Sequence, residues 1–471
     1  MALLLGRVSG LARELLLAFR FGVSREADVA VVLLTLPDLL VNLLLSGGLS
    51  AALVPRLRTL PDAQAAQVFQ QACLWALTFF GALALLIAIW PAGVVSLFAP
   101  GLSQPTSLIT APVAMLVALS IPLTALSGVT TAYLNAGSRY FIAGLGTFIF
   151  NAAIITALAW WQKGGLLVLS GAIAIGALFR LASQMAISPP QAWRKQPERV
   201  PADPRFRKAF TAGVMAASLA LVPAAMIRAA ASLLGPGNIA AFNYAQKLVE
   251  LPLGIFITTI STIALTRLSG HRADGDPLAA RRTLHANLRL SLILALFILL
   301  FGEALAGVLV SLVFERGTIS AGDVERIASL TRIALLGIPF ISVSSLATAA
   351  LNAQLRTPEV LRATGIALIA LIVIALPGLI ISSDRLLMGS VVGSQGILAW
   401  LLARRAKICL MGPDGVVNRR FFNAVAAGCA VALPFAAIPL FLSGSDIAAI
   451  GLGAIGFGAG TSVSAKILGF W

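Results

Sequence analysis

Four charged residues lie within the first, strongly apolar segment of this 471-residue chain. The segment MALLLGRVSGLARELLLAFRFG carries Arg7, Arg13, Glu14 and Arg20. A charge that faces lipid near the centre of a bilayer costs at least ~2.5–3.5 kcal/mol, so these side chains should face a partner or a water-filled cavity. Guanidinium groups in such a cavity would bind a compact anion, because an Arg fork donates charge-assisted hydrogen bonds to two oxygens at once.

Seven-residue spacing brings these charges onto one side of a helix. Arg7 lies over Glu14, and Arg13 lies over Arg20 in a neighbouring row. A helix over the whole segment spans roughly 30 Å, which places Arg13 near its middle. We predict that Arg13 lines a cationic transport cavity, and we keep a second reading in which Glu14 or Glu250 neutralises it as a structural ion pair. Arg7 is either a cavity cation or a topology anchor.

Later apolar segments carry further candidates for this cavity. Arg228 interrupts the run PAAMIRAAA, where it either faces the cavity or reaches back to the membrane surface. Lys247 and Glu250 lie one helical turn apart. They either pair with each other, or Glu250 positions Lys247 toward the cavity while Pro252 bends the helix.

The composition is that of a membrane protein. Hydrophobic residues make up 59% of the chain, charged residues only 11%, and the mean hydropathy is +0.96. A soluble domain carries about 25% charged residues, so we predict a polytopic membrane protein. The net charge of +16 lies in short loops, which argues against nucleic-acid binding. Three scattered cysteines argue against disulfides or a zinc site, and we predict no metal and no cofactor.

Apolar runs bounded by Gly, Pro or charge predict an all-α protein with about fourteen transmembrane helices. We place these helices near residues 2–22, 27–55, 69–97, 107–135, 140–161, 165–187, 208–234, 239–267, 284–312, 324–352, 358–381, 386–404, 421–442 and 446–468.

The loops fix a predicted orientation. With a cytoplasmic N-terminus, the predicted cytoplasmic loops hold twenty Lys and Arg residues and the opposite loops hold six. This positive-inside bias places both termini of a multi-pass membrane protein in the cytoplasm. Arg25 and Asp28 then lie at the outer mouth, either as a gate salt bridge or as a solvated loop pair.

An internal repeat divides the chain into two lobes. The segment IPLTALSGVTTAYLNA from Ile121 recurs as IPFISVSSLATAALNA from Ile338, an offset of 217 residues. We predict two parallel six-helix lobes with a binding site at their interface. The predicted domains are an N-lobe over 1–187, a cytoplasmic linker over 188–207, a C-lobe over 208–410, and two C-terminal helices over 411–471.

The sequence resembles the MurJ/MviN family of the multidrug/oligosaccharidyl-lipid/polysaccharide exporter superfamily. The segments GRVSGLARE, FRFGVSREADV, LPDLL and SGGLSAALVPRL match, in order and spacing, a family pattern like SRVLGLARD, ARxFGxGxxxDA, LPNLLRR and AEGAFSxAFVPxL. Further along, NYAQKLVELP is similar to the family's YYADRLxEFP. All fourteen predicted spans have counterparts in the family.

This resemblance implies a V-shaped pair of lobes around a cationic cavity that accepts a diphosphate-sugar headgroup, with the last two helices forming a groove for a polyprenyl tail. The family's functional cations fall on Arg7 and Arg13, with Glu14 beside the latter. Its loop aspartate falls on Asp28, and its helix-8 arginine falls on Lys247.

Two departures from the family pattern bear on the cargo. The Arg-Arg pair after LPNLL is replaced by Val41-Asn42, and the Glu of AEG is replaced by Gly47. Arg228 is an added intramembrane cation, and whether it replaces the missing pair is left open.

The resemblance therefore implies a flippase, not an enzyme, that moves the undecaprenyl-diphosphate-linked cell-wall precursor lipid II to the periplasmic leaflet for peptidoglycan synthesis and cell shape. An exopolysaccharide, capsule or O-antigen unit is the alternative cargo. A drug exporter or an integral-membrane glycosyltransferase using Asp28 is a weaker alternative. We expect a monomer that contacts membrane lipids and works with the cell-wall synthesis machinery, and we leave coupling to an ion or to the membrane potential open.

Overall fold

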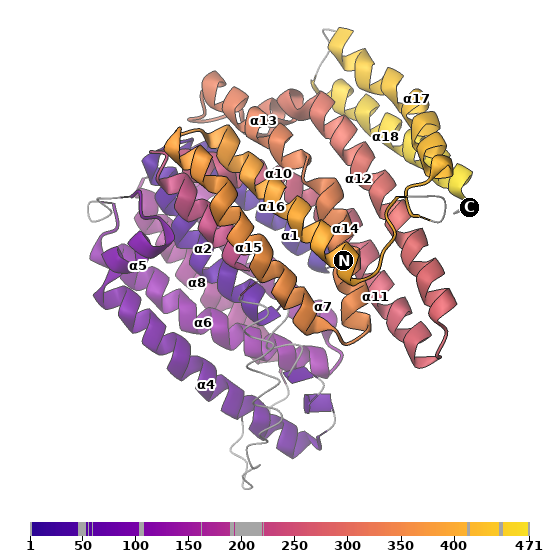
Figure 1. Cartoon of the computed structure of the whole chain (residues 1–471). Coiled ribbons are helices and arrows are strands. Elements are labelled where there is room, and N and C mark those ends of the chain that lie inside the picture. The colour runs from indigo at the N-terminus through magenta and orange to yellow at the C-terminus, as the bar shows by residue number, and fades with distance from the viewer. Residues whose placement is uncertain are drawn as a thin grey trace. The chain divides into compact units, whose positions relative to one another are not determined.

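The described part of the protein is helical. The computed structural model describes residues 2–45, 53–54, 56–58, 60–102, 108–161, 163–188, 193, 219, 221–411, 415–441 and 446–469. Within these ranges the chain forms helices joined by short loops, apart from one isolated β-bridge between Met411 and Val417. The predicted all-α class is confirmed (Figure 1).

The chain divides into two compact units, Met1–Ala240 and Ala241–Trp471. The named helices of the first unit are α1 (Ala2–Phe21), α2 (Arg25–Leu45), α4 (Asp62–Ile89), α5 (Pro91–Phe98), α6 (Ala111–Ala136), α7 (Tyr140–Trp160) and α8 (Gly165–Ile187). An apolar helix, Leu221–Ser232, belongs to the same unit. Most of the predicted linker, 188–207, lies outside the described residues, so the predicted domain boundaries stay a prediction.

The second unit continues from a helix that begins at the end of the first. Its elements are α10 (Asn238–Pro252), the π-helical turn η3 (Leu253–Ile257), α11 (Thr258–Ala273), α12 (Pro277–Phe314), α13 (Ala321–Leu335), α14 (Ile338–Ala353), α15 (Thr357–Ile380), α16 (Asp384–Arg405), α17 (Arg419–Phe441) and α18 (Asp446–Leu468).

Proline and capping residues explain where several helices begin. Pro91, Pro277 and Pro358 lie in the first turn of α5, α12 and α15, where a missing N–H costs nothing because that group has no partner within the helix. The α13 helix begins with a capping box: the Ser320 hydroxyl accepts from the backbone N–H of Asp323, and the Asp323 carboxylate accepts from the N–H of Ser320. These signals are local, since each lies in the first turn of its own helix.

The two copies of the repeat occupy the same place in their units. In the first unit, α6 packs against α2, α4 and α8; in the second, α14 packs against α11, α12 and α16. Buried small side chains, such as Ser127 in α6 and Ser342 in α14, allow these close approaches. The sequence repeat therefore corresponds to a structural repeat around one central helix.

The two copies of the repeat differ in what precedes them. The first copy lies within a continuous helix, whereas the second begins at a break between two helices. Pro122 lies inside the continuous helix α6, whereas Pro339 opens α14 after a 42° bend from α13. Gly337 lies at this bend, and a Cβ there would overlap the side chain of Gln395. The single helix predicted over 324–352 is therefore wrong, because Gly337 and Pro339 together interrupt it.

Seven of the described helices are long and apolar enough to cross a membrane, or eight if the bent pair α13–α14 is one span. The apolar helices Gly144–Trp160 and Leu221–Ser232 are shorter. On α4, large apolar side chains such as Trp75, Phe79 and Ile89 are exposed, as expected for a helix that faces lipid. The structure supports a multi-span membrane protein, and the count of fourteen stays a prediction.

Candidate functional site

Arg13 lies in a buried polar cluster of the first unit. Its side chain is 4% exposed, and Nη1 and Nη2 donate to the two carboxylate oxygens of Asp38 at 3.2 and 2.8 Å. The Arg13 Nη2 atom also donates to Glu14 Oε1 at 2.8 Å, and Nη1 donates to Asn151 Oδ1 at 3.2 Å. The two terminal nitrogens of Arg13 thus donate to two carboxylates and an amide.

Three helices build this cluster. Arg13 and Glu14 come from α1, Asp38 from α2 and Asn151 from α7. The Asn151 amide donates back to Ser9 Oγ on α1 at 3.0 Å, so the same residue bonds both Arg13 and the helix that carries it. Asn151 therefore fixes the depth and orientation of α1 in the first unit.

The two acids of the cluster differ in exposure. The Glu14 side chain is 3% exposed, whereas that of Asp38 is 35% exposed. Arg13 is neutralised by Glu14, as one of the two sequence readings predicted, and also by Asp38, which no reading included. Asp38 forms the accessible side of the cluster, where an anion could exchange with it.

A second arginine is buried close to this cluster. Arg180, on α8, is 1% exposed, and none of its guanidinium nitrogens has a hydrogen-bond partner among the described residues. Its side chain packs along Gly146 of α7, and the Asp38 carboxylate attracts it electrostatically. With Arg13, Glu14 and Asp38 ionised, the cluster carries one excess negative charge, which Arg180 balances.

Gln184 links α8 to the central helix of this unit. Its Oε1 accepts from Ser127 Oγ at 2.7 Å, and its Nε2 donates to Thr131 Oγ1 at 2.9 Å. These buried bonds hold α8 against α6, and Arg180 lies one helical turn before Gln184. Arg180 is therefore positioned by a rigid neighbour.

Asp28 and Arg25, both predicted at the outer mouth, have different environments. Arg25 is exposed, whereas Asp28 is 0% exposed. The Asp28 carboxylate accepts from the backbone N–H of Gly237 at 2.6 Å and of Ala240 at 2.8 Å. Asp28 thus caps the N-terminus of α10, and the solvated loop pair does not describe it.

Of the remaining predicted site residues, Arg7 and Arg228 belong to the first unit, and Lys247 and Glu250 belong to the second. Arg7 is exposed on α1, and Arg228 is half-buried in the helix Leu221–Ser232. In the second unit, Lys247 Nζ lies 2.7 Å from Glu250 Oε2, with side chains 24% and 56% exposed. The two residues therefore pair with each other, as one of the two readings predicted.

The π-helical turn η3 follows Pro252 directly and connects α10 to α11. Proline has no N–H to donate within the helix, and π-turns of this kind recur where such a defect has to be absorbed. The sequence predicted a bend at Pro252, and the structure has a π-helical turn directly after this residue.

Sequence reasoning missed Asp38 and Arg180. Both are ionisable residues inside apolar helices, which is the signal that identified Arg13. Asp38 lies in LPDLL, where the related family pattern has the uncharged LPNLL. The side chains of Val41 and Asn42, which replace the family's arginine pair, lie outside the described part of α2, as does Gly47.

A family model for the lipid II flippase MurJ matches residues 17–444. The chain belongs to the MurJ family. The match extends over most of both units and includes Asp38, Asn151 and Arg180, but it begins four residues after Arg13 and so contains only the last turn of α1.

Curated relatives agree with this membership. The chain is 26% identical over 366 residues to the "probable lipid II flippase MurJ" of Thermotoga maritima, covering 75% of this chain and 72% of the relative. It is 27% identical over 371 residues to the lipid II flippase MurJ of Burkholderia cenocepacia, covering 72% and 70%.

Solved structures show the same fold. A lipid II flippase MurJ in an inward closed conformation is 20% identical, with a TM-score of 0.85 over 99% of this chain and 98% of that one. An inward-facing multidrug resistance MATE family transporter is 13% identical, with a TM-score of 0.68 over 85% and 94%. These two structures show the fold, and the MurJ structure matches more of the chain.

Proposed function

We propose that this chain moves lipid II, the undecaprenyl-diphosphate-linked peptidoglycan precursor, from the cytoplasmic to the periplasmic leaflet of the bacterial inner membrane. The observation that carries the proposal is the MurJ family match over residues 17–444. The buried, two-arginine cluster of the first unit supports it, because a membrane protein retains costly intramembrane charges where they serve a charged cargo.

The diphosphate of the cargo binds Arg13 by exchanging with Asp38. In the structure the two carboxylate oxygens of Asp38 accept from both terminal nitrogens of Arg13. Two oxygens of a phosphate would bind the guanidinium in the same geometry. Asp38 is the accessible acid, and Arg180 offers it a second cation close by. When the Asp38 carboxylate is released from Arg13, the positive charge of Arg180 still lies close to it.

Arg7, Lys247 and Arg228 supply further positive charge along the route of the headgroup, and Glu250 positions Lys247 through their ion pair. Arg25 and Asp28 belong to the outer gate. Asp28 ties the start of α2 to the start of α10, so an outward opening that separates these helix ends has to break its two hydrogen bonds. The Asp28 cap thus opposes outward opening.

The C-terminal helices α17 and α18 hold the polyprenyl tail. They pack closely on each other and on α12 (Figure 1). The glycines of α18 allow this approach: a Cβ at Gly456 would lie 2.6 Å from Phe435 Cβ, and one at Gly460 would lie 2.8 Å from Ala432 Cβ. Gly456 and Gly460 are therefore packing positions of α18.

The protein acts as a monomeric transporter, not as an enzyme, with both termini in the cytoplasm, and it works beside the machinery that polymerises peptidoglycan. Its cycle is reset by the membrane potential, because moving one charge across 100 mV is worth about 2.3 kcal/mol. A flipping rate in vesicles that does not respond to an imposed potential would exclude this energy source.

Rescue of a strain depleted of its lipid II flippase tests the proposed function. The wild-type chain should restore growth and rod shape, and Arg13→Ala should not, at equal membrane abundance. A wild type that fails to rescue, while mass spectrometry of the purified protein finds a different polyprenyl-diphosphate glycan, would reassign the cargo to an exopolysaccharide, capsule or O-antigen unit.

A further inference from the structure

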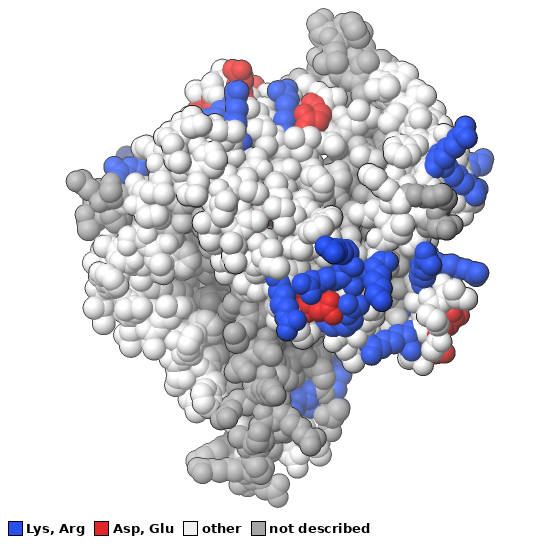
Figure 2. Space-filling view, viewed as in Figure 1, with Lys and Arg blue, Asp and Glu red and all other residues white. Residues whose placement is uncertain are grey.

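A cavity of about 630 Å³ opens in the second unit, away from every residue assigned above. It lies where α11 ends, α12 begins, and α14 and α16 end. Most of the side chains that line it are basic or apolar. Figure 2 shows Lys and Arg side chains gathered on the face that carries the α14–α15 loop.

Five basic residues line the cavity: His271, Arg272, Arg281, His285 and Lys407. Asp276 is the single acid among the described lining residues. Its Oδ1 caps α12 by accepting from the backbone N–H of Ala279 at 2.9 Å. Even with both histidines neutral, three cations face one engaged carboxylate, so the cavity favours an anion.

Local structure holds several of these basic groups in place. Arg272 Nη1 donates to the backbone carbonyl of Ala353 at 3.0 Å, which ties α11 to the end of α14. The His271 Nε2 atom lies 3.0 Å from Thr283 Oγ1, which ties α11 to α12. Lys407 follows α16 with a positive φ of 54°, and its N–H bonds the carbonyl of Arg404 as the helix ends. The cavity is thus formed before any ligand arrives.

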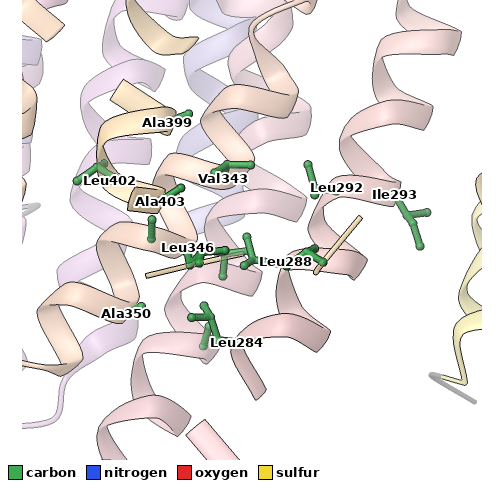
Figure 3. Packing of buried hydrophobic residues seen from close by; sticks show 14 of the residues in the cluster. Leu284, Leu288, Leu292, Ile293, Val343, Leu346, Ala350, Ala399, Leu402 and Ala403 are labelled. Carbon is green, nitrogen blue, oxygen red and sulfur yellow. The ribbon is translucent and has the colours of Figure 1, made fainter. Parts of the chain in front are cut away.

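The floor of the cavity is the hydrophobic core of the unit. Leu268, Leu284, Ala350, Ala353 and Ile408 line it and also belong to one buried cluster. Figure 3 shows Leu284, Leu288, Leu346 and Ala350 of this cluster packed between neighbouring helices. A ligand with an anionic head and an apolar body would therefore find complementary groups in one place.

The cavity lies at the polar end of α12. This helix has 38 residues and is about 57 Å long, whereas a bilayer core is about 30 Å thick, so its ends extend beyond the hydrocarbon. Its first turns carry Arg281, Arg282, His285 and Arg289, and an apolar run begins at Leu292. The cavity therefore belongs at the membrane–water boundary, on the side where the positive-inside bias places the cytoplasm.

We propose that this cavity binds the phosphate of an anionic phospholipid from the cytoplasmic leaflet, with the glycerol and upper acyl chains against the apolar floor. Basic pockets between transmembrane helices on the cytoplasmic side have the chemistry for such headgroups. The inference concerns a membrane lipid and holds whether or not lipid II is the cargo. Inorganic phosphate shares the anionic chemistry but has nothing to place on the apolar floor.

Two adjacent arginines provide a matched test. Arg281 lines the cavity, whereas Arg282, equally exposed on the same helix turn, does not. The full-length protein is purified as wild type, Arg281→Gln and Arg282→Gln, and phosphatidylglycerol and phosphatidylcholine are titrated separately while binding is read by native mass spectrometry. We expect wild type and Arg282→Gln to prefer phosphatidylglycerol, and Arg281→Gln to lose about fivefold in affinity for it.

Three outcomes overturn the proposal. Equal losses in the two variants would mean that general surface charge attracts the lipid. Equal binding of phosphatidylglycerol and phosphatidylcholine by the wild type would exclude selection for an anionic headgroup. The third outcome is displacement of phosphatidylglycerol from the wild type by millimolar inorganic phosphate, with phosphate binding lost in Arg281→Gln. That result would assign the cavity to a free anion. Because each readout is lipid binding, all three are separate from failure of the flippase assay.

Discussion

Arg13 and Asp38, 25 residues apart on α1 and α2, meet in a two-pronged ion pair that closes the accessible side of a buried cluster. Their contact occupies the guanidinium face that a diphosphate would need. The pair therefore makes Asp38 a competitor of the cargo, and replacing its charge should separate binding from release.

Asp38→Asn should bind lipid II more tightly and flip it more slowly. The amide keeps the size of the carboxylate but not its charge, and a tenfold fall in Kd corresponds to about 1.4 kcal/mol. Native mass spectrometry titration and a vesicle flipping assay measure the two quantities. Asp384→Asn is the control, because Asp384 pairs with Arg326 at 2.7 Å in the second unit. Weaker binding in Asp38→Asn would show that Asp38 positions Arg13 for the cargo and does not compete with it.

Arg13→Lys should preserve charge but lose both stability and transport. A lysine ammonium cannot hold two carboxylate oxygens, Glu14 and Asn151 at once, and each charge-assisted hydrogen bond contributes about 1.5–3 kcal/mol. The melting temperature in detergent and rescue of the depleted strain should both fall. Arg326→Lys weakens a partly exposed pair, in which Arg326 Nε lies 2.7 Å from Asp384 Oδ2, and should cost under about 1 kcal/mol. Full rescue by Arg13→Lys would mean that only the charge at this position matters.

Arg180→Met should lower both thermal stability and transport. Arg180 balances the excess negative charge of the Arg13 cluster, and removing one partner of a buried ion pair costs about 3–5 kcal/mol because it leaves the other charge uncompensated. Transport should fall because Asp38 loses its second cation. Exposed Arg139→Met, in the same unit, should change neither quantity. A melting temperature in detergent equal to that of the wild type would show that Arg180 does not neutralise the cluster, and unchanged transport would exclude the exchange with Asp38.

The sequence predicted what depends on local patterns and missed what depends on distant partners. Apolar length predicted helices within α12 and α15 but merged α4 and α5 into one span over 69–97, and the charge within α1 predicted that Arg13 faces a cavity or an ion-pair partner. The second acid of the Arg13 cluster could not be assigned, because helix contacts between α1 and α2 decide which acid reaches Arg13. Asp28 looked like a loop residue since its partners lie 209 and 212 positions further along the chain.

Asp28→Asn should loosen the start of α10. Asparagine retains one acceptor oxygen, so one of the two bonds to Gly237 and Ala240 is lost, and removal of a helix cap costs about 0.5–2 kcal/mol. Hydrogen exchange of the backbone amides at 237–240 should accelerate. If the Asp28 cap opposes outward opening, the outward-open population should also increase. Ser320→Ala removes the exposed cap of α13 and should leave exchange at 237–240 unchanged. Faster exchange in both variants would reflect general destabilisation.

Gly460→Leu should separate α18 from its neighbours, whereas Gly458→Leu, two residues earlier, should not. A Cβ at Gly460 would overlap Phe297 of α12 and lie 2.8 Å from Ala432 Cβ of α17, while one at Gly458 would meet nothing within 4 Å. Overpacking of this kind costs about 1–3 kcal/mol, so Gly460→Leu should melt at a lower temperature. If the α17–α18 pair holds the polyprenyl tail, Gly460→Leu should also weaken binding of a long-chain polyprenyl diphosphate more than binding of a short-chain analogue. Equal weakening of binding for the two diphosphates would show that the tail binds elsewhere. A displaced α18 can weaken binding of the long-chain compound more only if it contacts the part of the chain that the short analogue lacks.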